Sequence, residues 1–200
     1  MIIVGLTGSI ATGKSETGRM FHGLGVPVLE ADTVVHDLYA KGGAAVRPVA
    51  ALMPDSCVDG AIQRDRLATA LQKAPDLLVR LEAIVHPLVR RAQTAFVENA
   101  IAAGHRLVVL DIPLLLEKGR GTEVDKIVVT TCNPALQRAR ALARPGMTVE
   151  KFTWILARQM PDAEKRVLAD YVIDTGEGLE AARRRVEAII EELAGAASHA

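Results

Sequence analysis

The sequence is poor in aromatic side chains and has no net charge. Only 3% of its 200 residues are Phe, Trp or Tyr, which is too few for a platform on which nucleic-acid bases stack. Its 24 Lys and Arg are balanced by 24 Asp and Glu, whereas proteins that bind a phosphate backbone carry a basic excess. We therefore predict that nucleic acid is not a partner.

Cysteine and long apolar runs are also scarce. Cys57 and Cys132 are far apart and neither belongs to a C-x-x-C pair, so no disulfide framework or thiolate metal site is expected. The best candidate for a membrane span, residues 107–116, is broken by Asp111 and Pro113 and falls short of the roughly 18 apolar residues required. The first residues lack the basic region of a signal peptide. We expect a soluble, cytoplasmic protein with no membrane partner.

Short apolar runs alternate with longer helical patterns along the chain. The runs are rich in β-branched residues and bounded by Gly, Pro or Asp, as buried strands are; they comprise residues 2–6, 26–29, 107–112, 126–131 and 171–173. This alternation predicts an α/β fold, with a parallel sheet of five strands covered by helices on both faces.

The last helical pattern is the clearest. Its apolar stripe consists of Leu179, Ala182, Val186, Ile189, Ile190 and Leu193, which should face the core. Arg183 and Glu187 are spaced for an ion pair on the solvent face. The small-residue tail after Leu193 is expected to fray.

Two stretches do not fit the simple alternation. Residues 33–103 contain helical patterns but no convincing strand, which predicts a helical insertion. Residues 134–168 form a second helical piece that is rich in arginine. The remaining segments, 1–32, 104–133 and 169–200, would form the core of a single domain.

The first predicted strand runs directly into a phosphate-loop motif. The string Gly8-Ser9-Ile10-Ala11-Thr12-Gly13-Lys14-Ser15 matches G-x-x-x-x-G-K-[ST] between a strand and a helix. Gly8 and Gly13 allow the backbone to curl so that its N–H groups form an anion-sized nest, and the helix that starts near Lys14 adds the positive end of its dipole. Lys14 would reach the β- and γ-phosphates, and the Ser15 hydroxyl would ligate Mg²⁺. The motif predicts a nucleoside triphosphate site.

The phosphate loop alone leaves three enzyme classes open: a switch GTPase, a motor-type ATPase and a small-molecule kinase. The chain has no N-K-x-D string for reading guanine. The apolar residues 107–110 end in one acid, Asp111, rather than in the paired acids of a motor ATPase. Asp111 would either hold Mg²⁺ through water or cap the following turn.

Two further side chains have both a functional and a structural interpretation. Asp32 follows the second predicted strand, at the edge where open α/β sheets bind ligands, and could accept a proton from a substrate hydroxyl. It is also placed to cap the next helix. His86-Pro87 follows a helical stretch over residues 77–85, and such a step more often marks a turn or kink than a ligand.

With these motifs the sequence resembles the dephospho-CoA kinases, the last enzymes of coenzyme A synthesis, from Met1 to about Gly178. The phosphate loop is shared by many families, but the other pieces are specific in their order and spacing. They are Glu30-Ala31-Asp32 in place of the family's Asp-Ala-Asp, residues 84–89 (I-V-H-P-L-V), residues 111–117 (D-I-P-L-L-L-E), residues 158–161 (R-Q-M-P) with Lys165, and residues 169–174 (A-D-Y-V-I-D).

The resemblance implies a P-loop NTPase core like that of the nucleoside monophosphate kinases, with residues 33–103 as a CoA-binding insertion and residues 134–168 as a short lid. It implies that Mg²⁺-ATP phosphorylates the ribose 3′-hydroxyl of dephospho-CoA. Asp32 would orient or deprotonate that hydroxyl, while Arg138 and Arg144 would approach the transferred phosphoryl group.

The remaining candidate site residues follow from the same matching positions. On the acceptor side are His86, Pro113 and Glu117. The ATP loop comprises Gly8, Ala11, Thr12, Gly13, Lys14, Ser15 and Glu16, and the candidate Mg²⁺ ligands are Ser15 and Asp111. The alternatives are another small-molecule kinase, of the nucleoside monophosphate or gluconate type, and a non-catalytic nucleotide sensor. We expect a monomer or a weak homo-oligomer.

Some positions depart from the family pattern. Ala11 replaces a loop glycine, and we expect a negative φ there. Glu16 replaces a threonine, and its carboxylate would either lower ATP affinity or point to solvent. Glu30 replaces the first aspartate of the family's Asp-Ala-Asp, which is less critical than the second. Arg144-Pro145-Gly146 stands where an Arg-Asp pair is usual, which affects the lid hinge.

Overall fold

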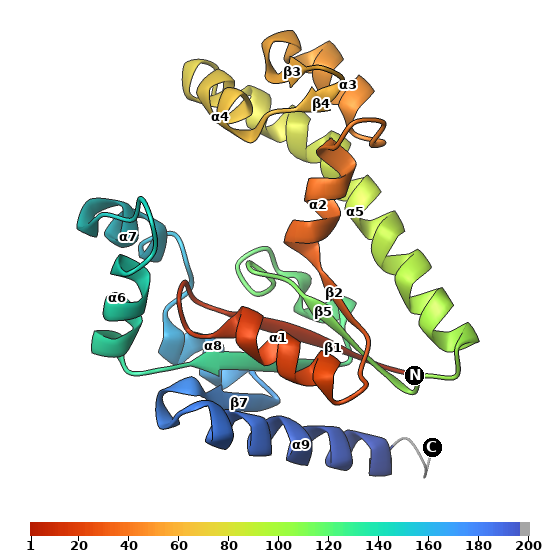
Figure 1. The fold of residues 1–200 in the computed structure, drawn as a ribbon, viewed down its shortest axis with the longest axis vertical. Helices are drawn as coiled ribbons and strands as arrows, with labels where there is room; N and C mark the ends of the chain where they lie inside the picture. The colour runs from red at the N-terminus through yellow and green to blue at the C-terminus, as the bar shows by residue number, and fades with distance from the viewer. Residues whose placement is uncertain (197–200) are drawn as a thin grey trace. The chain divides into compact units, whose positions relative to one another are not determined.

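The computed structural model describes residues 1–196, and the chain divides into two compact units (Figure 1). One unit comprises Met1–Val28 and the chain from Ala100 onward, and the other is Leu29–Asn99. The expected boundaries of core, insertion and lid stay predictions.

A five-stranded sheet lies at the centre of the first unit. Its order is β2-β5-β1-β6-β7, and β1 pairs in parallel with both β5 and β6, as β6 does with β7. The strands are β1 (Ile2–Gly8), β2 (Val28–Glu30), β5 (Leu107–Asp111), β6 (Lys126–Thr131) and β7 (Tyr171–Asp174). All five predicted strands and the parallel sheet are confirmed.

Helices α1 (Lys14–Gly23) and α9 (Leu179–Ala196) cover one face of this sheet (Figure 1). Leu6 of β1, Phe21 of α1 and Ile189 of α9 are fully buried in one apolar core, which provides the main hydrophobic stabilisation of the unit. The predicted ion pair between Arg183 and Glu187 is present at 3.1 Å. Leu179 does not belong to the buried stripe as predicted, because it is the first residue of α9 and is 63% exposed.

The helical piece between β6 and β7 consists of α6 (Pro134–Leu142), α7 (Val149–Leu156) and α8 (Asp162–Leu168). The Asn133 side chain caps α6 by accepting a hydrogen bond from Ala135 N, and Thr148 caps α7 by accepting one from Lys151 N. Such caps stabilise helix ends. Helix α8 packs against β6, and Figure 1 shows it behind the sheet.

The second unit is mainly helical, and its helices enclose an apolar core of their own. They are α2 (Ala31–Tyr39), α3 (Val46–Leu52), α4 (Arg64–Lys73) and most of α5 (Leu77–Ala102). Short 3₁₀ turns lie at Pro54–Ser56 here, and at Arg120–Glu123 and Thr175–Glu177 in the first unit. Val49 is fully buried, and Leu81 of α5 packs in the same cluster.

The prediction that residues 33–103 contain no strand is wrong. β3 (Cys57–Val58) and β4 (Ala61–Ile62) form a short antiparallel hairpin. Asp59 and Gly60 have positive φ angles of 51° and 80°, as a two-residue hairpin turn requires. Each strand has only two residues, which is too short for an alternating pattern to be visible in the sequence.

Of the turn or kink expected at His86-Pro87, the turn is absent, because Pro87 lies inside α5. Proline removes one backbone hydrogen bond from a helix. Val85 and Val89, on either side of it, are both buried in the core of the unit. Their packing stabilises a helix that continues through the proline.

Asp170 ties the beginnings of β6 and β7 together. Its carboxylate accepts hydrogen bonds from Ile127 N at 2.8 Å and from Lys126 Nζ at 2.9 Å. Burial raises the pKa of the Asp170 carboxyl, but the hydrogen bonds it accepts and the positive charge of Lys126 together outweigh burial and lower the pKa below its ordinary value of 3.8. A lowered pKa means that the charged carboxylate stabilises the fold at neutral pH, and that this contribution is lost as the pH falls through the folded-state pKa.

The substitution Asp170→Asn should therefore lower the free energy of unfolding by about 0.5–1 kcal/mol at neutral pH, a modest amount because the ion pair is partly exposed to solvent. The difference between variant and parent should shrink once the pH falls below 3.8. Urea titrations at about pH 7 and about pH 3 measure it. An equal difference at both pH values would contradict the role of the charge.

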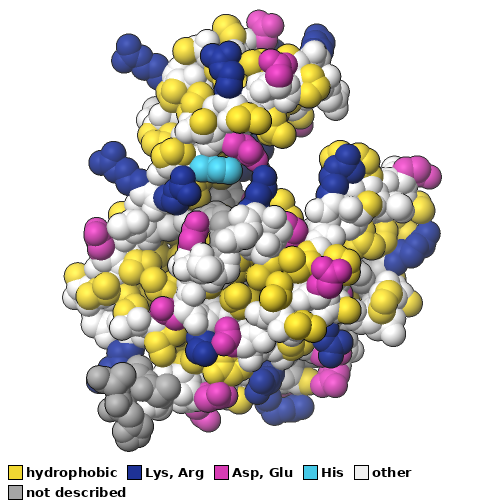
Figure 2. Space-filling model, turned by 180° about the vertical axis from the view of Figure 1, so that it is seen from behind, with side chains coloured by type: hydrophobic (Ala, Val, Ile, Leu, Met, Phe, Trp, Pro, Cys, Tyr) yellow, Lys and Arg dark blue, Asp and Glu magenta, His cyan; other side chains and the backbone are white. Residues whose placement is uncertain are grey.

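Basic and acidic side chains are interspersed over the face drawn in Figure 2. A single-sign stripe that would steer a long polyanion is not seen on that face. Within residues 1–196, no helix is long and apolar enough to cross a membrane.

Candidate active site

The phosphate loop leaves the carboxyl end of β1 and enters α1. Gly13 caps the helix with a left-handed φ of 93°, and α1 begins at Lys14 as predicted. Thr12 closes the loop, because its hydroxyl donates to Ser9 O at 2.8 Å and lies 2.9 Å from Thr130 Oγ1. A Cβ at Gly8 would lie 2.2 Å from that same Thr130 Oγ1, so only glycine fits where the loop starts.

The prediction of a negative φ at Ala11 is wrong, since its φ is 62°. The loop imposes a left-handed conformation that costs an L-residue about 1–2 kcal/mol. Ala11 is buried and packs with Ala141 and Phe152, and this packing offsets part of the cost.

Lys14 and Asp111 form an ion pair beside the loop. Asp111 ends β5 and is only 3% exposed, while Lys14 is 17% exposed. The ammonium neutralises a carboxylate that would be costly to bury alone. The pair places one cation and one acid at the carboxyl ends of adjacent strands, where open α/β sheets bind ligands.

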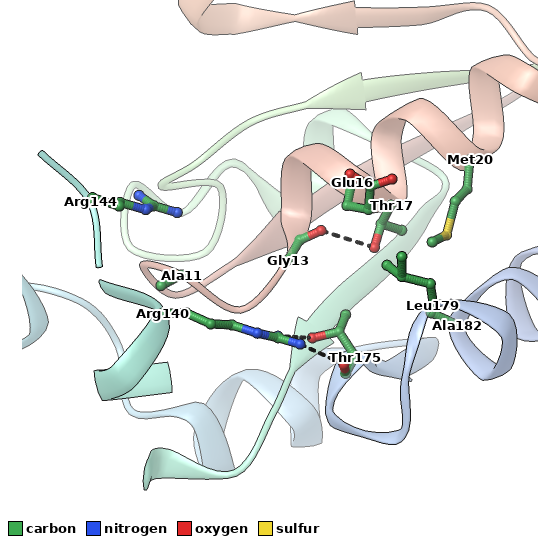
Figure 3. Close-up of a pocket in the computed structure, with 10 residues that line it drawn as sticks. All are labelled: Ala11, Gly13, Glu16, Thr17, Met20, Arg140, Arg144, Thr175, Leu179 and Ala182. Atoms are coloured by element: carbon green, nitrogen blue, oxygen red, sulfur yellow. Dashed lines mark hydrogen bonds between the residues drawn. The ribbon is translucent and has the colours of Figure 1, made fainter. Parts of the chain in front are cut away.

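A cavity of about 260 Å³ opens next to the loop (Figure 3). Apolar side chains line one part of it, namely Met20, Leu179, Ala182 and Ala11. Polar groups line the rest, namely Gly13, Glu16, Thr17, Arg140, Arg144 and Thr175. An apolar wall with a few convergent polar groups is typical of a small-molecule site.

Arg140 and Thr175 join this cavity to the loop. Arg140 Nη1 donates to Thr175 Oγ1 at 2.8 Å and Arg140 Nη2 donates to Thr175 O at 3.0 Å (Figure 3). Thr175 Oγ1 in turn lies 2.8 Å from the carbonyl oxygen of Thr12 in the loop. The site residues proposed from the sequence did not include Arg140 or Thr175. Thr175 could have been proposed from its position directly after the last strand.

The two predicted lid arginines are placed differently. Arg144 lines the cavity, whereas Arg138 is exposed on α6 and does not line it. Glu16 lines the cavity and pairs with Arg19 on the surface of α1. Ser15 is exposed in the first turn of the same helix.

Two candidate acceptor residues lie in the first unit, in the segment after β5. The Thr7 hydroxyl donates to Pro113 O at 3.2 Å, which joins that segment to β1. Glu117 accepts a hydrogen bond from Met160 N at 3.0 Å and lies 2.7 Å from Lys165 Nζ, which is fully buried. Glu117 therefore contacts the segment that leads from α7 to α8.

Asp32 and His86 belong to the second unit. Asp32 does not cap α2 as proposed: the helix begins at Ala31, so that Asp32 is exposed in its first turn and Glu30 occupies the cap position. Arg64 Nη2 donates to the carbonyl oxygen of Asp32 at 3.2 Å. His86 Nε2 lies 4.0 Å from Glu82 Oε1 on the same helix face.

Comparisons with known proteins agree on one family. A family model described as dephospho-CoA kinase matches residues 2–180. The dephospho-CoA kinase of Mesorhizobium japonicum is 53% identical over 195 residues, which cover 98% of each chain. The crystal structure of TT1252 from Thermus thermophilus aligns with a TM-score of 0.82 at 32% identity, covering 96% of this chain and 97% of that one.

A second solved structure supports the fold. The dephospho-CoA kinase from Campylobacter jejuni aligns with a TM-score of 0.65 at 20% identity, over 96% of each chain. Together with the phosphate loop, the extent of the family match and the identity to its members show that this chain belongs to the dephospho-CoA kinase family.

Proposed function

We propose that this protein transfers the γ-phosphoryl group of ATP to the ribose 3′-hydroxyl of dephospho-CoA, which gives coenzyme A and ADP. The observation that carries the proposal is a complete phosphate loop, with Lys14 paired to Asp111, in a chain that matches the family over residues 2–180. The reaction breaks the bond between the γ-phosphorus and the ADP oxygen and forms one to the ribose oxygen. The hydroxyl proton leaves to a base.

The cavity beside the loop would hold the nucleoside of ATP. Met20 and Leu179 offer apolar contacts for a base, and Arg140 presents a planar guanidinium whose position is fixed by two hydrogen bonds to Thr175. A guanidinium plane stacks well on an aromatic ring. From this cavity the triphosphate would run along the loop amides toward Lys14.

Magnesium would accompany the triphosphate, as it does in phosphoryl-transfer enzymes. Ser15 and Asp111 supply a hydroxyl and a carboxylate, the oxygen donors that Mg²⁺ prefers. A Cβ at Gly18 would lie 3.8 Å from Asp111 Oδ2, so the carboxylate faces the first turns of α1, the helix that carries Ser15. The residues fit the ion: Ser15 would bind it directly and Asp111 through water. When bound, Mg²⁺ neutralises charge on the phosphate oxygens.

The remaining candidates would serve alignment and charge stabilisation, which are the main needs of phosphoryl transfer. Arg144, at the edge of the cavity, would stabilise the moving phosphoryl group, and Arg138 would join it when the lid closes. Asp32 would orient or deprotonate the ribose hydroxyl. His86, Pro113 and Glu117 are proposed on the acceptor side.

An assay of ADP release tests the function. With ATP and Mg²⁺ present, release should depend on dephospho-CoA and stay at background with nucleoside monophosphates, with gluconate or without an acceptor. Release that requires a different acceptor would favour another small-molecule kinase. Binding of ATP with no turnover on any acceptor would favour a nucleotide sensor.

We further place the protein in the cytoplasm. Cys57 and Cys132 are both free thiols, which suits a reducing compartment. Burial raises the pKa of the Cys132 thiol, which keeps it protonated and unreactive. The monomeric or weakly associated state stays a prediction, for which light scattering is the measurement.

A further inference from the structure

Two glutamines hold one residue of the phosphate loop from both sides. Gln137 Nε2, from α6, donates to the carbonyl oxygen of Ile10 at 2.8 Å. Gln159 lies just after α7, and its Oε1 accepts a hydrogen bond from the amide N–H of Ile10 at 2.9 Å. Both glutamines lie in the helical piece between β6 and β7, more than 120 residues along the chain from the loop.

The orientation of both side-chain amides is fixed by these bonds. A backbone N–H only donates and a backbone carbonyl only accepts, so Gln137 must present its nitrogen and Gln159 its oxygen. Gln137 is only 8% exposed and Gln159 is half-buried. A hydrogen bond shielded from water is costly to break, because its partner group is left unpaired.

Ile10, the residue that both glutamines bind, directly precedes Ala11, where the loop backbone is strained. Ala11 has its φ at 62°, a conformation that persists only when the surroundings enforce it. The same helical piece also contributes apolar contacts, since Ile10 and Ala11 pack with Ala141 and Phe152. Two hydrogen bonds and this small cluster therefore fix the outer part of the loop.

We infer that Gln137 and Gln159 are positioning residues for ATP: they hold the loop in the curled form whose amides bind the triphosphate. The inference rests on the proposed use of the loop for ATP. It assigns to the segment around α6 and α7 a role in shaping the nucleotide site, in addition to carrying the lid arginines.

The two glutamines can be distinguished by the same near-isosteric change. Gln137→Glu replaces the donor by a carboxylate, which cannot donate to Ile10 O and repels it. Gln159→Glu keeps an acceptor for Ile10 N–H. Both variants add one negative charge near the loop, so general repulsion of ATP should weaken binding in both alike. Only Gln137→Glu also loses its hydrogen bond to Ile10.

We expect Gln137→Glu to raise the Kd for ATP, measured by calorimetry, about tenfold more than Gln159→Glu does. KM for ATP should rise in parallel, while kcat at saturating ATP changes less, because bound ATP restores the loop. Gln72→Glu, the same change on the exposed face of α4, is the control and should match the parent.

Parent-like ATP binding in Gln137→Glu, or an equal loss in both loop variants, would overturn the inference. Thermal unfolding, followed by circular dichroism, verifies that each variant is folded at the assay temperature. If the parent binds ATP but does not phosphorylate dephospho-CoA, the proposed acceptor fails, and the calorimetric comparison still decides whether the hydrogen bond from Gln137 to Ile10 positions the loop.

Discussion

Replacing Lys14 with alanine should reduce phosphoryl transfer by about a thousandfold or more, to the background of the assay. The ammonium group is the cation of the phosphate loop, and removal of one preorganised charge or donor at a reacting centre typically costs about 10²–10³ in rate. Its loss should also weaken ATP binding, because nothing else in the loop carries a side-chain positive charge. Steady-state kinetics with dephospho-CoA and calorimetry with ATP measure the two effects.

The stability of this variant needs its own control. Asp111 is 3% exposed and pairs with Lys14, so the alanine variant also removes the cation from a buried carboxylate and should unfold at a lower temperature. Lys14→Arg keeps a cation for Asp111 but presents a larger, planar group to the phosphates. It should restore much of the stability and little of the activity. Near-normal turnover in Lys14→Ala would refute the assignment of the loop.

The sheet could be predicted because each buried strand corresponds to a short, continuous run of apolar and β-branched residues in the sequence. Residues 126–131 are apolar or β-branched apart from Lys126, and β6 covers that range without change. The phosphate loop could also be predicted, because binding an anion requires its glycines and Lys14 at a fixed spacing within one short segment. Such features depend on the residues themselves and not on distant partners.

Features that depend on distant partners could not be predicted. The positive φ of Ala11 is imposed by the curled phosphate loop and supported by packing against residues 141 and 152, and no local rule for alanine contains either. The role of Thr175 follows from its proximity to Thr12 and Arg140. Pro87 lies within a helix because residues on either side of it pack into a core. In each case tertiary packing outweighed a local preference.

The candidate site was predictable only where a motif is continuous in the chain. Lys14 and Asp111 are 97 positions apart, and their pairing follows from β1 and β5 being adjacent strands. Alternating strands and helices predict a parallel sheet, but several strand orders are compatible with that pattern. The contact between Lys14 and Asp111 therefore required the structure.

Replacing Asp32 with asparagine should lower kcat by about a hundredfold or more if its carboxylate accepts the proton of the ribose hydroxyl, since general-base catalysis contributes about 10²–10⁴. Asparagine has nearly the same shape and can still accept a hydrogen bond, but it cannot take up the proton at neutral pH. The side chain is exposed in the first turn of α2, so the free energy of unfolding should change by no more than about 0.5 kcal/mol. The measurement is kcat with both substrates saturating.

Asp37→Asn supplies a matched control, because Asp37 is another exposed aspartate of the same helix. It removes the same charge from the same helix, and its kcat should equal that of the parent. A large loss in Asp32→Asn with no loss in Asp37→Asn would identify a base at position 32, as distinct from a general effect of negative charge on α2. A loss of less than about fivefold in Asp32→Asn would instead mean that the side chain only orients the hydroxyl, because an amide oxygen performs that task as well as a carboxylate does.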